Sequence, residues 1–460
     1  MKKIFILAIL ITISILPAMA KTPQISDKSI EYLNIEWWEN FKDDNLTKNL
    51  MTVYNNNYDL KNAALKVQEN EKLVKMQFAQ ELPFLNFSGD LNRDLRASAQ
   101  QFGSMKIPNY SQNNYYLPLT MSYEIDIWGT NRLKTKSMKE QLEIVKQAQR
   151  ATYIALTSNF AADYFNLIKA DKLLEIQNEL VKTQENIVKL VFEKYKAGLC
   201  SINELLAEQK FLTSLKEEQN MHKLTQQLLI ESLKVYLADA EENVARNSYE
   251  NVILINHIAQ KYDTSVVENR PDFKQEEANI KRIGFDVQVA KREFLPKFTI
   301  IGQIGLNAYS LSKLFNSPAQ FFNLGVLPSM DLFSGGRKLA FLKLKKDQYE
   351  EALNDYQKTF LVGIKEINSG ILEYKIAKKN YNESLNRFNT QTKIYNLAKD
   401  KNKIGASGNI DVMYAKEAYL FIKKEEVSNK INTLISIISL YKATGGVDLS
   451  KINIKKNDML

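Results

Sequence analysis

The chain has 460 residues and a formal net charge of +9, from 62 lysines and arginines and 53 aspartates and glutamates. Because the basic residues are scattered among acidic ones, they favour a solvated helical surface over a nucleic-acid-binding one, and we expect no nucleic-acid partner. One cysteine and two histidines exclude a disulfide framework within the chain and provide no nucleophile–base pair or metal-ligand set, so we expect neither catalysis nor a cofactor.

The first twenty residues have the pattern of a secretory signal peptide. Lys2 and Lys3 precede an apolar run that ends at Leu16, and Ala18 and Ala20 form a small-x-small cleavage site. The run of about 13 residues is too short to cross a bilayer as a helix, and no later stretch reaches ~18 consecutive apolar residues. We therefore expect an exported protein that enters a membrane only as a closed β-barrel or by lying on the surface.

A helix, a β-hairpin and a polar loop are predicted next. The helix covers 59–82. In 84–92 and 115–127 every second side chain is apolar, as in a strand with one buried face. The polar loop 93–114 separates these runs, so we predict a hairpin over 84–127 whose strands have the length of tilted membrane-spanning strands.

The hairpin is followed by the motif DIWGTNR, which contains Asp126, Trp128, Gly129 and Arg132. Gly129 provides a tight turn, and Trp128 falls where an aromatic belt would lie at a membrane interface. Arg132 begins a helix, although the helix dipole does not favour a cation there. Apolar residues at intervals of seven continue through 132–197 without a proline, which predicts a supercoiling helix about 100 Å long.

A glycine turn and a second helix complete the first series of elements. Gly198 and Leu199 form the turn, and Glu204 lies in the first turn of a helix predicted over 202–238. The segment 241–268 that follows has the weakest periodicity.

The whole series then returns about 205 residues later. DLFSGGR repeats the motif of the first copy and supplies Asp331, Phe333, Gly336 and Arg337. Among fourteen positions linked by the seven-residue spacing in the two copies, only Asn402 is not apolar. Such a match indicates a duplication.

The second copy predicts the same elements in the same order. They are a helix that begins near Asp272, a hairpin over 297–332, a long helix over 337–403, a turn at Gly405, and a helix over 409–442 with Asp411 in its first turn. We therefore divide the chain into a signal peptide (1–20), a first repeat (21–268) and a second repeat (269–460). Four strands in two separate hairpins cannot close a barrel alone, so the arrangement implies oligomerisation.

Together these features resemble the TolC-type outer-membrane efflux proteins. The resemblance rests on WWENFKDDNLTKNL near the start, NRPDF at 269–273, a Leu-Pro pair before each first strand, the two exit motifs and the two glycine turns. It implies an α+β membrane protein in which three chains of four strands close a twelve-stranded β-barrel. Long coiled-coil helices would continue as a periplasmic α-helical tunnel, with 241–268 and 445–460 as a belt around its middle.

The resemblance also implies roles for the turns. It places the periplasmic tip, where an adaptor docks and the aperture closes, at Gly198, Leu199 and Gly405. Glu204 and Asp411 match acidic positions, and each would form a ring of three carboxylates in a homotrimer. The alternative for both is a first-turn acid that stabilises a helix N-terminus.

Three further residues lie at the expected tips. Asn402 and Ser407 stand where relatives can carry the tyrosine and arginine of gate-closing links, so any lock must use other residues. Cys200 is predicted to pack as a small apolar side chain in the first turn.

The function expected from the resemblance is a passive exit duct in the cell outer membrane that extends into the periplasm. Its partners would be two more copies of the chain, outer-membrane lipid, a periplasmic adaptor and an inner-membrane pump, with drugs or other small molecules as cargo. A component of type I protein secretion is an open alternative. A periplasmic coiled-coil scaffold would explain the heptads but not the hairpins, and an autonomous porin would need more strands and no ~100 Å helices.

Overall fold

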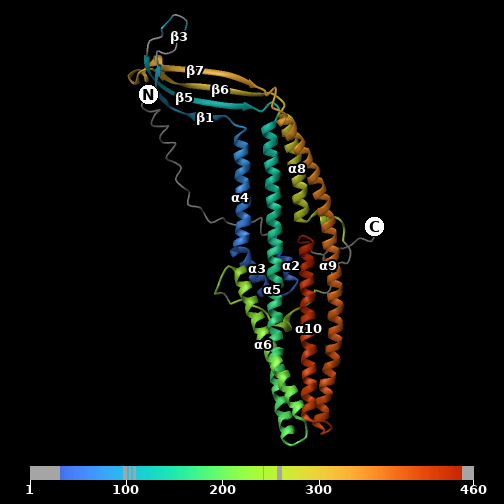
Figure 1. Cartoon of the computed structure of the whole chain (residues 1–460). Helices are drawn as coiled ribbons and strands as arrows, with labels where there is room; N and C mark the ends of the chain where they lie inside the picture. Colours follow the sequence, from blue (N-terminus) through green and yellow to red (C-terminus); the bar gives the residue numbers. More distant parts are fainter. Residues whose placement is uncertain are drawn as a thin grey trace. The chain divides into compact units, whose positions relative to one another are not determined.

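The computed structural model describes residues 32–96, 101–102, 105–106, 110–241, 243–255 and 262–447 (Figure 1). The expected signal peptide and residues 448–460 of the expected belt lie outside these ranges. Two compact units make up the chain: a helical unit from 1–66, 146–274 and 358–460, and a sheet unit from 67–145 and 275–357. Each unit therefore draws residues from both predicted repeats.

The sheet unit is built on one antiparallel sheet (Figure 1). Its strands are β1 (Phe84–Phe87), β2 (Asp90–Arg96), β5 (Tyr110–Ile125), β6 (Lys297–Ala308) and β7 (Gln320–Ser329). Both β1 and β2 pair with β5, β5 pairs with β6, and β6 pairs with β7. The two predicted hairpins are thus not separate, because the β5–β6 pair joins them into one sheet.

Pro118 accounts for the break between β1 and β2. The same register continues across it, since Phe87 is opposite Leu119 and Asp90 is opposite Tyr116. Proline has no N–H for the ladder, and the only described backbone bond at the break runs from the Ser88 N–H to the Pro118 carbonyl at 3.2 Å. The two short strands therefore act as one long edge.

The sheet has one apolar and one polar face, as the alternation predicts. In register across β1, β5, β6 and β7, one face carries the row Leu85, Met121, Gly302 and Leu324, and the other carries the row Asn86, Thr120, Gln303 and Asn323. Beyond the paired strands lie a short ribbon and two single turns, namely β3 (Gln101–Phe102) with β4 (Met105–Lys106), η3 (Leu311–Lys313) and η4 (Ser317–Ala319).

Helices account for most of the rest. The two longest, α5 (Thr130–Lys196) and α9 (Arg337–Lys403), have 67 residues each. The shorter ones are α2 (Ile35–Glu39), α3 (Asp44–Asn56), α4 (Tyr58–Ala79), α6 (Ile202–Leu237), α7 (Ser265–Glu268), α8 (Pro271–Arg292) and α10 (Asn409–Ala443), with a single turn η2 (Tyr249–Asn251). None of the helices among the described residues has an apolar stretch long enough to cross a membrane.

An aromatic core holds the helical unit together. Trp37 of α2 stacks on Tyr441 of α10 with ring centroids 3.7 Å apart, and the indole N–H of Trp38 donates to the Leu33 carbonyl. Of the heptad residues of α5, Tyr153, Phe160 and Leu167 are fully buried in the same cluster. The tryptophan motif near the start of the chain is therefore a packing element that fixes α2 against α10.

Candidate functional site

The first exit from strand to helix is organised by Asp126. Its carboxylate accepts bonds from the backbone N–H groups of Asn131 (3.1 Å) and Arg132 (3.0 Å), and the Arg132 Nε lies 3.3 Å away. Gly129 provides the turn in a left-handed conformation with φ of +69°. Asp126 thus lies at the N-terminus of α5, where the helix dipole favours an acidic residue. Its carboxylate also pairs with Arg132, the cation that the dipole alone would disfavour there.

Trp128 ties this exit to the second copy. Its indole N–H donates to the carbonyl of Pro296, 2.7 Å away, and Pro296 belongs to the Leu-Pro pair that precedes β6. The ring is 40% exposed. The sequence pattern predicts an interfacial position for Trp128 and does not indicate this bond.

The second exit has the same parts in a looser arrangement. Gly335 and Gly336 have φ of +59° and +81°. The Asp331 carboxylate lies 3.3 Å from the Lys338 ammonium and 3.9 Å from the Arg337 guanidinium. Phe333 is 90% exposed, so the aromatic residue of this exit makes little contact within the chain.

The first tip is a tightly closed helix end. Gly198 has φ of +68°, and the N–H of Leu199 returns to the Lys194 carbonyl at 2.9 Å, a bond typical of helix ends with a left-handed glycine. The Ser201 hydroxyl accepts from the N–H of Glu204 and caps α6. The Leu199 side chain is 75% exposed at the apex.

The second tip is closed by different groups. Gly405 has φ of +74°, and the Asp411 carboxylate accepts from the N–H of Gly408 at 2.9 Å at the start of α10. The Asn402 side chain donates to the Ser407 carbonyl at 2.9 Å. Asn402 and Ser407 therefore bond to each other within the turn.

Polar contacts connect α10 with the α5–α6 hairpin, and we call them the interhelical contacts. Tyr414 donates to Glu208 of α6 at 2.7 Å, and Lys416 lies 2.8 Å from Glu179 of α5. Lys424 donates to Gln177 of α5 at 2.9 Å and to Glu218 of α6 at 2.5 Å. Sequence analysis could not locate them, because the partners are scattered over three helices.

Buried titratable groups accompany these contacts. Burial, together with the nearby Glu208 carboxylate, raises the pKa of Glu417 to about 7. Burial and the Lys424 ammonium lower the pKa of His222. The pKa of Glu417 therefore lies close to neutral pH.

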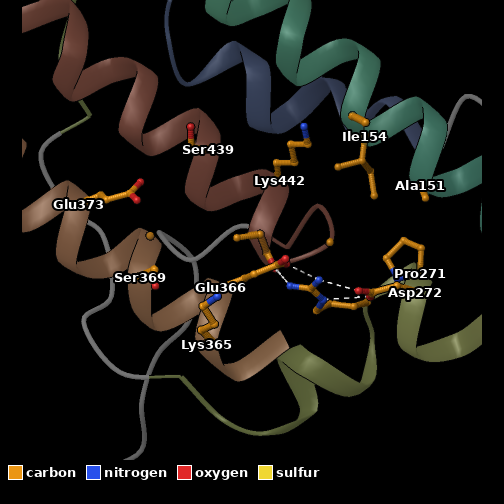
Figure 2. A pocket seen from close by; sticks show the side chains of 15 residues that line it. Ala151, Ile154, Pro271, Asp272, Lys365, Glu366, Ser369, Glu373, Ser439 and Lys442 are labelled. Carbon is orange, nitrogen blue, oxygen red and sulfur yellow. Dashed lines mark hydrogen bonds and ion pairs between the residues drawn. The ribbon is translucent and has the colours of Figure 1, made fainter. Parts of the chain in front are cut away.

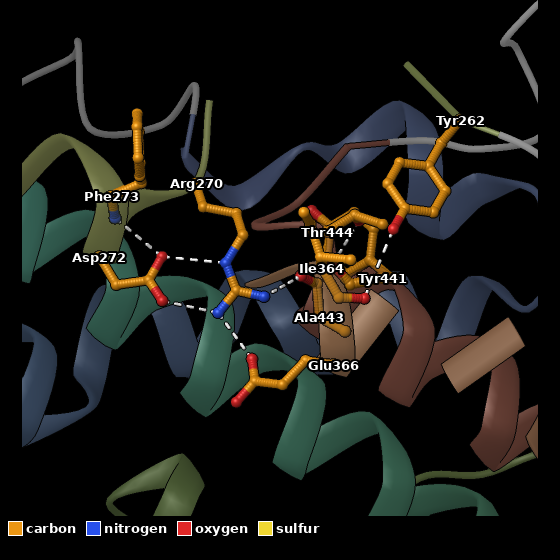
Figure 3. A network of polar contacts seen from close by, with 9 residues as sticks. All are labelled: Tyr262, Arg270, Asp272, Phe273, Ile364, Glu366, Tyr441, Ala443 and Thr444. Atoms are coloured by element: carbon orange, nitrogen blue, oxygen red, sulfur yellow. Dashed lines mark hydrogen bonds and ion pairs between the residues drawn. The ribbon is translucent and has the colours of Figure 1, made fainter. Parts of the chain in front are cut away.

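A second polar network joins α8, α9 and α10 through Arg270 (Figure 3). The guanidinium donates to both oxygens of Asp272 at 3.0 and 2.6 Å, to Glu366 at 2.6 Å and to the Ala443 carbonyl at 2.6 Å. One side chain thus binds the start of α8, the middle of α9 and the last residue of α10. The motif NRPDF supports the helix junction through its arginine and aspartate.

A hollow of about 590 Å³ lies beside this junction (Figure 2). Small residues of three helices line it, including Ala151 of α5, Gly370 of α9 and Ser439 of α10, with charged side chains among them. The Arg270 and Asp272 side chains that line it are bonded to each other.

Comparison with known proteins identifies the chain. The model of the family described as "Outer membrane efflux protein" matches residues 50–241 and 264–446. The chain belongs to this family. A probable efflux pump outer membrane protein of Pseudomonas putida, TtgC, is 22% identical over 413 residues, which are 89% of this chain and 84% of that protein. The probable outer membrane lipoprotein SilC of Salmonella typhimurium is 23% identical over 421 residues, which are 90% of this chain and 88% of that protein.

Solved structures show the same fold. The CmeC outer membrane channel of Campylobacter jejuni aligns with a TM-score of 0.83 and 23% identity, over 95% of this chain and 92% of that one. The MtrE outer membrane channel of Neisseria gonorrhoeae aligns with a TM-score of 0.79 and 17% identity, over 94% and 96%. The expected fold class is thereby confirmed: the four strands are one chain's share of a β-barrel, and the long helices belong to a tunnel. The protein is an outer-membrane efflux protein that extends into the periplasm.

Proposed function

We propose that three copies of this chain form the exit duct of a tripartite efflux pump, together with a periplasmic adaptor and an inner-membrane pump. The observation that carries the proposal is the sheet with two open edges. Among the strands of the described residues, β7 on one side and β1 with β2 on the other have a partner on one side only. An open edge has unpaired N–H and C=O groups that can pair with a further strand. Pairing β7 of one copy with β1 and β2 of the next would close a ring.

The two faces of the sheet support a ring that spans a membrane. A barrel wall needs an apolar face toward lipid and a polar face toward the lumen, and the sheet carries both. Phe322, Leu324 and Val326 on the apolar face are 59–71% exposed. Such exposure is expected of side chains that contact outer-membrane lipid.

The helical unit supports oligomerisation independently. Apolar side chains on α6 and on α9 are about half exposed or more, and they are Met221, Leu228 and Val235 on the first and Leu361, Leu372, Ile376 and Leu397 on the second. Apolar surface of this extent marks an interaction site. We assign it to the contacts between neighbouring copies.

The repeats and the tips belong to the same proposal. The family model matches the chain twice, on either side of residues 242–263, which supports a division into repeats over 21–268 and 269–460 and a pseudo-sixfold assembly. We propose that the adaptor docks at the turns of Gly198 and Gly405, where Leu199 and Ile404 are 75% and 80% exposed.

The acidic residues at the tips would narrow the aperture. Three copies would bring together three Glu204 and three Asp411 side chains, and rings of carboxylates select cations. Both acids also take part in helix caps, so charge and capping must be separated experimentally. Asp411→Asn keeps an oxygen acceptor for the N–H of Gly408 and removes the charge.

For the cargo we propose small molecules, because relatives carry names such as antibiotic, solvent and toluene efflux pump outer membrane protein. The test is planar-bilayer recording of protein purified from outer membranes. We expect a small cation-selective conductance. Its cation selectivity should fall in Asp411→Asn and fall further in Asp411→Ala, because that variant also loses the helix cap. A protein that forms no channel would refute the duct, and an unchanged selectivity in both variants would remove Asp411 from the aperture.

A further inference from the structure

We propose that Asp90, Tyr116 and Phe321, on the polar face of the sheet, form a binding site for aromatic organic cations that pass through the barrel. The inference rests on the proposed function, because it takes the polar face as the luminal one, and it adds the chemical class of the cargo. No family comparison assigns these residues.

Two aromatic rings meet across a strand that separates them. Tyr116 of β5 and Phe321 of β7 are stacked, with ring centroids 5.2 Å apart and planes within 18° of each other. Since β6 lies between their strands, the backbones are about 9–10 Å apart, and the rings meet only because both lean over β6. The Tyr116 hydroxyl donates to the Gln303 side chain at 3.3 Å, which holds the phenol in this position.

Gly305 of β6 lies between the two strands that carry the rings. It is opposite both Pro118 and Phe321 in the register. A Cβ at Gly305 would lie 2.3 Å from the Leu117 carbonyl oxygen, so the position excludes any side chain. The rings stand on β5 and β7, which both pair with β6, so their positions are fixed by the strands of the sheet.

A carboxylate lies on the same face, on the strand that pairs with β5 on the side away from Phe321. Asp90 is the register partner of Tyr116, and directly paired residues project from the same side of a sheet. Its side chain is exposed, and its described contact is with the Asn92 amide at 3.4 Å. Both rings are half-buried, so each copy presents a negative charge and accessible aromatic surface on one face of the sheet.

This combination recognises one class of molecule. Aromatic faces attract cations and stack on other rings, and the carboxylate adds a full charge. Three copies would place three such sets around the lumen. A cation that carries aromatic rings should therefore be held better than an aliphatic cation of the same charge and similar size.

Current block in planar bilayers tests the site with two matched probes, tetraphenylphosphonium and tetrabutylammonium. The variant is Phe321→Leu, which removes the ring but keeps the bulk, and its control is Phe322→Leu on the apolar face. We expect wild type and control to be blocked by tetraphenylphosphonium at lower concentrations than by tetrabutylammonium. Block of Phe321→Leu should require about fivefold more tetraphenylphosphonium than block of wild type. Block by tetrabutylammonium should change less than twofold.

Asp90→Asn separates charge from stacking. It should weaken block by both cations, because each loses the same electrostatic attraction. Equal block by the two probes in wild type, or an unchanged preference in Phe321→Leu, would overturn the inference while leaving a conducting channel and the proposed function intact. Protein that conducts no current at all would overturn the proposed function and the luminal site with it.

Discussion

Replacing Arg270 by alanine should loosen the junction of α8, α9 and α10. The side chain is only 8% exposed, and it donates to Asp272, Glu366 and the backbone carbonyl of Ala443. The variant removes charge-assisted bonds to two carboxylates, and the Ala443 carbonyl at the end of α10 also loses its bond from the guanidinium.

The magnitude follows from burial. Removing one partner of a buried ion pair costs about 3–5 kcal/mol. Here the carboxylates of Asp272 and Glu366 are 41% and 47% exposed, so water replaces part of what is lost, and we expect about 3 kcal/mol. Arg387→Ala on α9 is the matched control. Arg387 pairs with Glu425 but is 54% exposed, and its loss should cost less than about 1 kcal/mol.

Hydrogen–deuterium exchange on the detergent-purified protein measures the effect locally. In Arg270→Ala, peptides covering the last turns of α10 and the first turn of α8 should exchange on the order of a hundredfold faster. Arg270→Lys should lie between, because an ammonium keeps the charge but cannot make the forked contact. If Arg270→Ala exchanged no faster than Arg387→Ala, the junction would not depend on this network.

Three further predictions test other parts of the structure. Trp128→Phe keeps a ring but loses the bond to the Pro296 carbonyl, and should lower the free energy of unfolding of the sheet unit by about 1 kcal/mol; stability in denaturant equal to wild type would argue against the tie. Gly198→Ala and Gly405→Ala should each cost about 1 kcal/mol because of their left-handed backbone, whereas Gly284→Ala in α8 should be neutral or stabilising; equal melting temperatures for all three would contradict the turn geometry. Glu417 has a folded pKa of about 7 against an ordinary 4.5, so its burial destabilises the fold increasingly as pH rises from 4.5 to 7. Glu417→Gln should therefore raise the melting temperature at pH 8, by an amount corresponding to no more than about 3 kcal/mol, and leave it unchanged at pH 4.5. A pH-independent effect on the melting temperature would refute the assignment.

Local features were predicted well from the sequence, because they depend on neighbouring residues alone. The left-handed conformations follow from the glycines at 129, 198, 336 and 405, and the long helices follow from heptads without proline. Strand alternation separated the two faces of the sheet. The bounds of the two long helices differ from the predicted ones by two residues at most.

Contacts between distant segments were the part that sequence reasoning missed. Nothing in the alternation of β5 or β6 says that the two hairpins share a sheet, since either edge of a hairpin can accept a strand. Arg270 lies in a motif that we recognised, but its partners Glu366 and Ala443 are about 100 and 170 residues away. The capping role of Asp126 depends on a turn that brings it back to the N–H groups of Asn131 and Arg132, which the order of the residues alone does not show.

The measurement that tests the central claim most directly is the native mass of the protein extracted from outer membranes in mild detergent. The account predicts an assembly of three chains, each close to the 53.0 kDa of the full sequence less any processed segment, which dissociates on heating. The open edges of the sheet would then be closed by neighbouring copies. A monomer that leaves the membrane fraction without detergent would contradict the barrel, and with it the duct.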